Sequence, residues 1–143
     1  MSQPPAATIT HTPIDVRWVG RLAFEAGRPQ GPKVGIDGDG QAAPSPFDLL
    51  LAAIASCASV DVVSILEKQR TPVRALSVRI EAERVDAIPR RLAAATLHFN
   101  IEAPGTTLDK AKRAIDLAVN KYCSVRSSLG ADSPVTWTVE LTA

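Results

Sequence analysis

Residues 45–70 read SPFDLLLAAIASCASVDVVSILEKQR, and this stretch decides the fold because no other segment is both as long and as nearly free of charge. Between residues 47 and 66 its ionisable side chains are Asp48, Cys57 and Asp61. A helix formed here would be apolar on most of its circumference and would have to be wrapped by other elements. The stretch therefore predicts a long, buried central helix.

The start of this helix is well signalled. Ser45 is a suitable N-cap, Pro46 follows where a missing N–H costs nothing, and Asp48 completes a capping box. The uninterrupted apolar run, residues 49–60, is shorter than the roughly 20 residues that a membrane span needs, and Asp61 interrupts its continuation. We therefore interpret the stretch as the core helix of a soluble protein.

Length and composition fit one globular domain over residues 1–143, with 45% hydrophobic and 22% charged residues. A formal charge of +1 with interspersed signs argues against nucleic-acid or membrane partners, which favour clustered Lys and Arg. Residues 1–13 lack the basic start and apolar run of a signal peptide, so we expect a loose tail on a cytoplasmic protein.

The remaining segments alternate between strand and helix patterns. Period-two alternation predicts strands, and the apolar spacing after residue 106 predicts an amphipathic helix. Thr106 and Asp109 are read as its capping box. The strands expected are a half-buried one at 16–25, a short one at 33–37, a hairpin pair at 74–84 and 91–102, and a closing one at 135–141, with a short helix inside 123–130.

This order predicts an α+β fold with an antiparallel sheet, a long central helix and a second, amphipathic helix. One sheet and one amphipathic partner cannot cover a helix that is apolar almost all round. We therefore expect a homodimer in which the two 45–70 helices lie near each other.

Two cysteines, Cys57 and Cys123, are the residues through which chemistry is expected. They are 66 residues apart, and the sequence does not prove that they meet. If they do, a peroxide would oxidise one thiol to a sulfenic acid, and the other would condense with it to a disulfide. A buried thiolate also needs stabilisation, for which a cation is expected. The candidate cations are Arg17, Arg21, Arg28 and Arg126.

The two cysteine segments, SPFDLLLAAIASCASVDVV and KYCSVRSSL, together resemble the OsmC/Ohr family of osmotically inducible and organic-hydroperoxide-resistance proteins. The resemblance extends from about residue 16 to residue 141 and implies an intertwined homodimer with long central helices. It also implies thiol-dependent reduction of hydroperoxides, with Cys57 attacking the peroxide and Cys123 resolving the sulfenic acid. The implied reductant is a dithiol or a lipoylated protein, and no cofactor or metal is implied.

The chain departs from the peroxidase members at two places, one of which is the loop before the helix, where the family's activating arginine has no clear match. The peroxidase members also typically have a glutamate directly after the serine-proline or asparagine-proline pair, where this chain has Phe47, with Asp48 one residue on. One residue turns a helical side chain by about 100 degrees, so Asp48 need not substitute. The sequence thus resembles a divergent OsmC-like branch. Two alternatives stay open, a non-enzymatic dimer that binds a small apolar ligand and a disulfide redox sensor.

Overall fold

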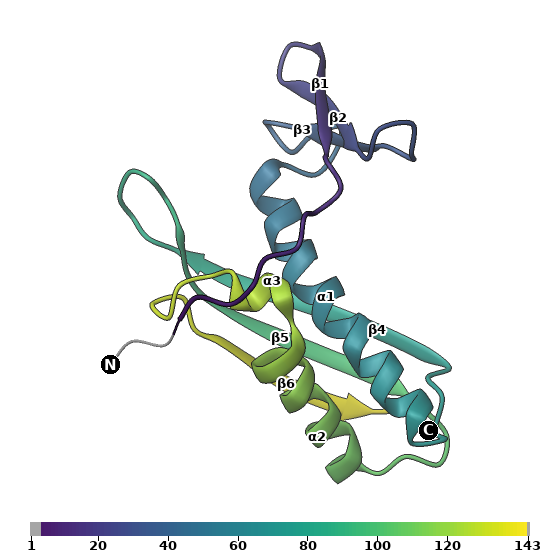
Figure 1. The fold of residues 1–143 in the computed structure, drawn as a ribbon. Helices are drawn as coiled ribbons and strands as arrows, with labels where there is room; N and C mark the ends of the chain where they lie inside the picture. Colours follow the sequence, from purple (N-terminus) through teal and green to yellow (C-terminus); the bar gives the residue numbers. More distant parts are fainter. Residues whose placement is uncertain (1–3, 143) are drawn as a thin grey trace. The chain divides into compact units, whose positions relative to one another are not determined.

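A computed structural model describes residues 4–142. The chain divides into two compact units, which meet in sequence between Leu49 and Leu50. The elements, labelled in Figure 1, are β1 (Asp15–Gly20), β2 (Ala23–Gly27), β3 (Val34–Asp37), α1 (Pro46–Lys68), β4 (Ala75–Arg84), β5 (Leu92–Glu102), α2 (Leu108–Leu117), η1 (Ala118–Tyr122), α3 (Ser124–Ser127) and β6 (Val135–Leu141). The predicted α+β class is confirmed, while a single domain over 1–143 stays a prediction.

The predicted tail is described only in part. Residues 4–13 are exposed and have no regular secondary structure, and residues 1–3 lie outside the described residues.

The N-terminal unit is a three-stranded antiparallel sheet in the order β1-β2-β3. The single strand predicted at residues 16–25 is wrong, because the chain reverses after Gly20 and Arg21, whose φ angles are 128° and 44°. Trp18 is directly opposite Phe24, and opposite residues of a hairpin share a face. The alternation therefore looks the same for one long strand and for two short ones. Within the chain Trp18 is 63% exposed, whereas Phe24 opposite it is half-buried, as predicted.

The loop before α1 is organised by a buried carboxylate and ends in the expected cap. The Asp37 side chain accepts hydrogen bonds from the backbone N–H groups of residues 39, 41 and 42 at 3.0–3.1 Å. The Ser45 N–H donates to the Asp48 carboxylate at 2.9 Å, and the Asp48 N–H donates to Ser45 Oγ at 3.1 Å. The predicted capping box at the start of α1 is thus confirmed.

The C-terminal unit contains the sheet β4-β5-β6, with α1 and α2 on the same face of it (Figure 1). β4 and β5 pair antiparallel from Ala75↔Glu102 to Arg84↔Leu92, as the predicted hairpin requires. β6 instead pairs with β5 in parallel, so the sheet is mixed, and the expectation of a wholly antiparallel sheet is corrected. The helical segment between β5 and β6 returns the chain to the end at which β5 begins, which makes a parallel pairing possible.

The core of this unit lies between the helices and β5. Its largest fully buried side chains are Ile54, Val62, Leu66, Leu97, Ile101 and Ile115. Four α1 residues spaced by four, from Ile54 to Leu66, form the buried stripe of that helix. The other apolar side chains of α1 are left partly or fully exposed within one chain, as Val60 is at 65%.

By length and composition alone, α1 is long and apolar enough to cross a membrane. The interpretation that its apolar run is too short therefore does not hold for the helix as a whole, which continues past Asp61 to Lys68. Core helices of soluble proteins meet the same criterion, and the buried stripe of α1 packs within its own unit, as such a helix does.

The second helix begins one residue later than predicted. Thr107, not Thr106, is the N-cap, and its hydroxyl accepts the Lys110 N–H at 3.2 Å. Thr106 donates its own N–H to the Ala103 carbonyl, closing the turn before the helix. At its other end α2 widens into the single π-turn η1, whose Cys123 N–H donates to the Ala118 carbonyl at 2.8 Å.

Candidate functional site

The structure brings the two cysteines together. Cys57 lies in the middle of α1, and Cys123 lies between η1 and α3, where it is the N-cap of α3. Both thiols are free, and the Cys123 side chain is hydrogen-bonded to Cys57. The Ser124 hydroxyl is 3.9 Å from Cys57 Sγ. Two residues that are remote in sequence thus share one site, while their catalytic roles stay a prediction.

Cys57 is the activated thiol of the pair. Partial burial raises its pKa, but hydrogen bonds with the Val125 backbone, the Cys123 side chain, and the side chain and backbone of Ser124 outweigh burial and lower the pKa overall. At a given pH Cys57 is therefore more often a thiolate, the form that acts as a nucleophile.

Cys123 is the opposite case. It is 2% exposed, and its sulfur accepts the Arg126 N–H at 3.3 Å. Burial raises the pKa of Cys123, and the neighbouring Cys57 raises it further, more than the N–H groups of Arg126 and Val125 lower it. Cys123 is therefore held as a protonated thiol beside an activated one.

No guanidinium is among the described groups that lower the pKa of Cys57, and activation by an arginine stays a prediction. Arg17 is paired with Glu25 at 2.9 Å and Arg21 with Asp39, both in the N-terminal unit, as is Arg28. Within residues 4–142 the groups that lower this pKa are backbone N–H groups and the side chains of Cys123 and Ser124. Arg126 contributes its backbone N–H to Cys123 rather than its guanidinium to Cys57.

Sequence reasoning therefore missed Ser124 and Val125. A signal was present, because both follow Cys123 directly at the start of the short helix predicted inside 123–130. Amides in a first helical turn have no intrahelical partner and are free to donate elsewhere.

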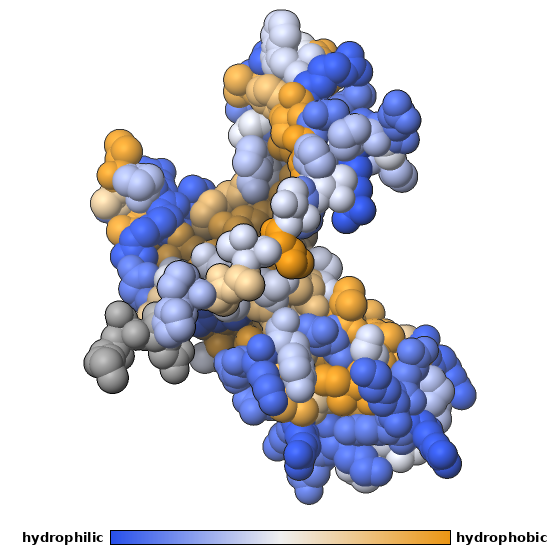
Figure 2. Space-filling model, in the orientation of Figure 1, coloured by the Kyte–Doolittle hydropathy of each residue, from blue (hydrophilic) through white to orange (hydrophobic). Residues whose placement is uncertain are grey.

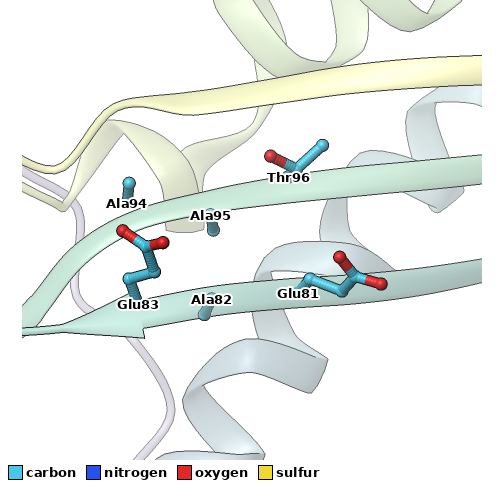
Figure 3. Close-up of a pocket in the computed structure, with 6 residues that line it drawn as sticks. All are labelled: Glu81, Ala82, Glu83, Ala94, Ala95 and Thr96. Carbon is cyan, nitrogen blue, oxygen red and sulfur yellow. The ribbon is translucent and has the colours of Figure 1, made fainter.

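A hollow on the sheet offers no comparable chemistry. About 430 Å³ in volume, it lies between β4 and β5, where Glu81, Glu83 and Thr96 project from one face and Ala82 and Ala95 from the other (Figure 3). It contains no thiol. Within the described part of the chain, no group of three or more His, Cys, Asp or Glu side chains is placed to hold a metal ion.

Known proteins are similar to this chain over most of its length. Residues 38–138 match the family described as OsmC-like protein. The chain is 36% identical to Protein YhfA of Escherichia coli K12 over 129 residues, which is 90% of this chain and 96% of that protein.

Solved structures share the fold at low identity. An OsmC-like protein from Mycoplasma pneumoniae is 17% identical, with a TM-score of 0.80 over 95% of this chain and 100% of that one. The organic hydroperoxide resistance protein OhrB of Bacillus subtilis is 13% identical, with a TM-score of 0.61 over 92% of this chain and 98% of that one. The paired thiols, the fold and the match over most of the sequence lead to one conclusion: this chain belongs to the OsmC-like protein family.

Proposed function

We propose that this protein reduces organic or small hydroperoxides by a two-cysteine mechanism, in defence against oxidative stress. The observation that carries the proposal is the pairing of a thiol of lowered pKa, Cys57, with a buried, protonated thiol, Cys123. The structural likeness to proteins named for organic hydroperoxide resistance supports it.

In the first step the Cys57 thiolate attacks the terminal oxygen of the hydroperoxide. A sulfur–oxygen bond forms, the oxygen–oxygen bond breaks, and the alkoxide leaves as an alcohol after taking a proton from water. Cys57 is then a sulfenic acid. The depressed pKa of Cys57 favours this step, because it raises the thiolate fraction at neutral pH.

In the second step the Cys123 sulfur attacks the Cys57 sulfenic acid. A disulfide forms, and the sulfenic hydroxyl leaves as water with the proton of Cys123. A dithiol, either free or on a lipoylated protein, then reduces the disulfide and is itself oxidised to a cyclic disulfide. The raised pKa of Cys123 keeps that proton available until it is needed.

The test is turnover of cumene hydroperoxide by reduced protein in the presence of a dithiol. Cys57→Ser should reduce turnover to the uncatalysed background. Cys123→Ser should still consume one equivalent of peroxide but form no intramolecular disulfide. Ser56→Ala, an exposed position on α1 one residue from Cys57, is the matched control and should behave as wild type. Turnover that survives Cys57→Ser would exclude this mechanism.

We also propose that the working form is a homodimer in the cytoplasm. Apolar side chains are exposed in both units, at Val16, Trp18 and Val34 in the N-terminal unit and at Val60 on α1. Figure 2 shows apolar residues at the surface of the molecule. A second copy would remove such residues from water. Sedimentation at micromolar concentration should give a dimer, and a monomer would contradict the proposal.

A ligand-binding role has one specific observation in its favour. A groove of about 440 Å³ lies beside α1, lined by apolar and polar side chains that include Asp61, Ile65, Leu117 and Tyr122. A non-enzymatic binder would leave Cys57 unmodified after peroxide treatment. A redox sensor would instead form one disulfide per chain without turnover.

A further inference from the structure

A further recess is lined by Cys123 and by basic side chains. It has a volume of about 310 Å³ and is lined in part by Cys123, Asn120, Lys121 and Arg126. None of its lining residues is acidic. Among residues 4–142 neither Lys121 nor Arg126 forms an ion pair, although Lys121 lies 5.3 Å from the ring centre of Tyr122. A thiol that is otherwise buried therefore contacts a small, positively charged recess.

The two sulfurs of a Cys57–Cys123 disulfide would not be equivalent towards an attacking thiolate. Attack on one sulfur expels the other, and the thiol of lower pKa leaves faster. The pKa of Cys57 is lowered and that of Cys123 is raised in the reduced site. The hydrogen bond with the Val125 backbone makes the largest contribution to lowering the pKa of Cys57. The same backbone group can stabilise the departing Cys57 thiolate. Attack at Cys123 with departure of Cys57 is thus the favoured direction.

We propose that the recess formed by Lys121, Cys123 and Arg126 selects small anionic thiols as reductants and directs them to the Cys123 sulfur. This inference rests on the proposed function, because it concerns the disulfide formed there. The reductant thiolate forms a bond with Cys123, the Cys57–Cys123 bond breaks, and Cys57 leaves as a thiolate. The second thiolate of a dithiol, or a second molecule of a monothiol such as 2-mercaptoethanesulfonate, then attacks the reductant sulfur, releasing the oxidised reductant and Cys123, which takes a proton from water.

The first experiment compares two thiols of similar size, one with a negatively charged sulfonate group and one with a neutral hydroxyl group. The disulfide form of the full chain is prepared with one equivalent of peroxide or diamide and mixed with 2-mercaptoethanesulfonate or with 2-mercaptoethanol. Rate constants are expressed per thiolate, so that differences in the thiolate fraction of the two thiols do not enter. The anionic sulfonate should react faster, by about fivefold for each cation that it meets, and added salt should remove part of this advantage.

Charge-neutral variants locate the effect. Lys121→Gln and Arg126→Gln should each reduce the ratio of the rate with the sulfonate to the rate with 2-mercaptoethanol by about fivefold. Lys112→Gln is the matched control, since it removes the same charge from an exposed position of α2 outside the recess. Equal rates for the two thiols in the wild-type protein would overturn the inference without requiring any variant to fold, and an equal loss of preference in Lys112→Gln would overturn it as well.

The position of attack is read by acid quench, alkylation and peptide mass analysis. The reductant should be found on Cys123, with Cys57 carrying the alkyl group. A reductant adduct on Cys57 would overturn the assignment. Failure here is distinguishable from failure of the proposed function: if peroxide produces no Cys57–Cys123 disulfide, the peroxidase proposal fails, whereas a disulfide reduced without charge preference refutes the recess alone.

Discussion

The surroundings of Cys57 and Cys123 differ although the two side chains share one site. Cys57 is half-buried in the middle of a long helix and has a lowered pKa, whereas Cys123 is 2% exposed and has a raised pKa. The N–H groups around α3 contribute to both, but burial and the neighbouring thiol outweigh them at Cys123. The difference shows how one short segment can prepare a nucleophile and a proton-bearing partner together.

The largest effect of this difference should appear in alkylation. At pH 7 and with limiting iodoacetamide, Cys57 should be modified faster than Cys123, because the lowered pKa of Cys57 and the raised pKa of Cys123 give Cys57 the larger thiolate fraction. Burial of Cys123 acts in the same direction. Peptide mass analysis measures the two rates of modification. Equal rates would contradict the difference in reactivity between Cys57 and Cys123.

The pH dependence of peroxide oxidation should report the pKa of Cys57 directly. Oxidation of Cys57 by peroxide under single-turnover conditions follows the thiolate fraction, so the rate should rise with pH and level off. Because the folded-state pKa of Cys57 is depressed, the midpoint should lie below the ordinary thiol value of 9.0. The measurement follows the first oxidation step in the wild-type chain with limiting peroxide, because the Cys123 side chain itself helps to lower the pKa of Cys57. A midpoint at or above 9.0 would show that burial raises the pKa of Cys57 by at least as much as the hydrogen bonds lower it.

The smallest expected effect comes from the Ser124 hydroxyl. Ser124→Ala removes one of the side-chain hydrogen bonds that lower the pKa of Cys57, and the N–H groups remain. Peroxide oxidation at pH 7 should slow by about twofold to threefold, the lower end of what one hydrogen bond contributes. Ser127→Ala, an exposed position at the end of α3, is the control and should leave the rate unchanged. Equal slowing in both variants would point to a general effect on α3.

Local signals in the sequence predicted the parts of the structure that depend on local interactions. Ser45 and Asp48 bond to each other three residues apart, so their capping box could be read directly. The β4–β5 hairpin follows from two alternating runs joined by a short connection. Adjacent threonines gave no means of choosing Thr107 over Thr106 as the cap, because either hydroxyl has the right chemistry.

Features that depend on tertiary placement were not predictable. The alternation over residues 16–25 is the same for one strand and for a tight hairpin, so the reversal after Gly20 was hidden. The direction of β6 depends on where the helical segment returns the chain. The meeting of Cys57 with Cys123 was expected through resemblance, but the amide donors were missed because backbone N–H groups carry no sequence identity.

The wide turn η1 has a consequence for how the chain tolerates change in length. A π-turn holds one residue more than the α-helical turn that could replace it. Deleting one residue there, such as Asn120, would let α2 continue as a regular helix with one residue fewer in the turn, whereas deleting one residue from the regular part of α2 would rotate everything after it by about 100 degrees. The wide turn can therefore absorb a one-residue deletion with Cys123 kept beside Cys57, while a one-residue deletion within the regular helix, residues 108–117, should remove the paired-thiol chemistry.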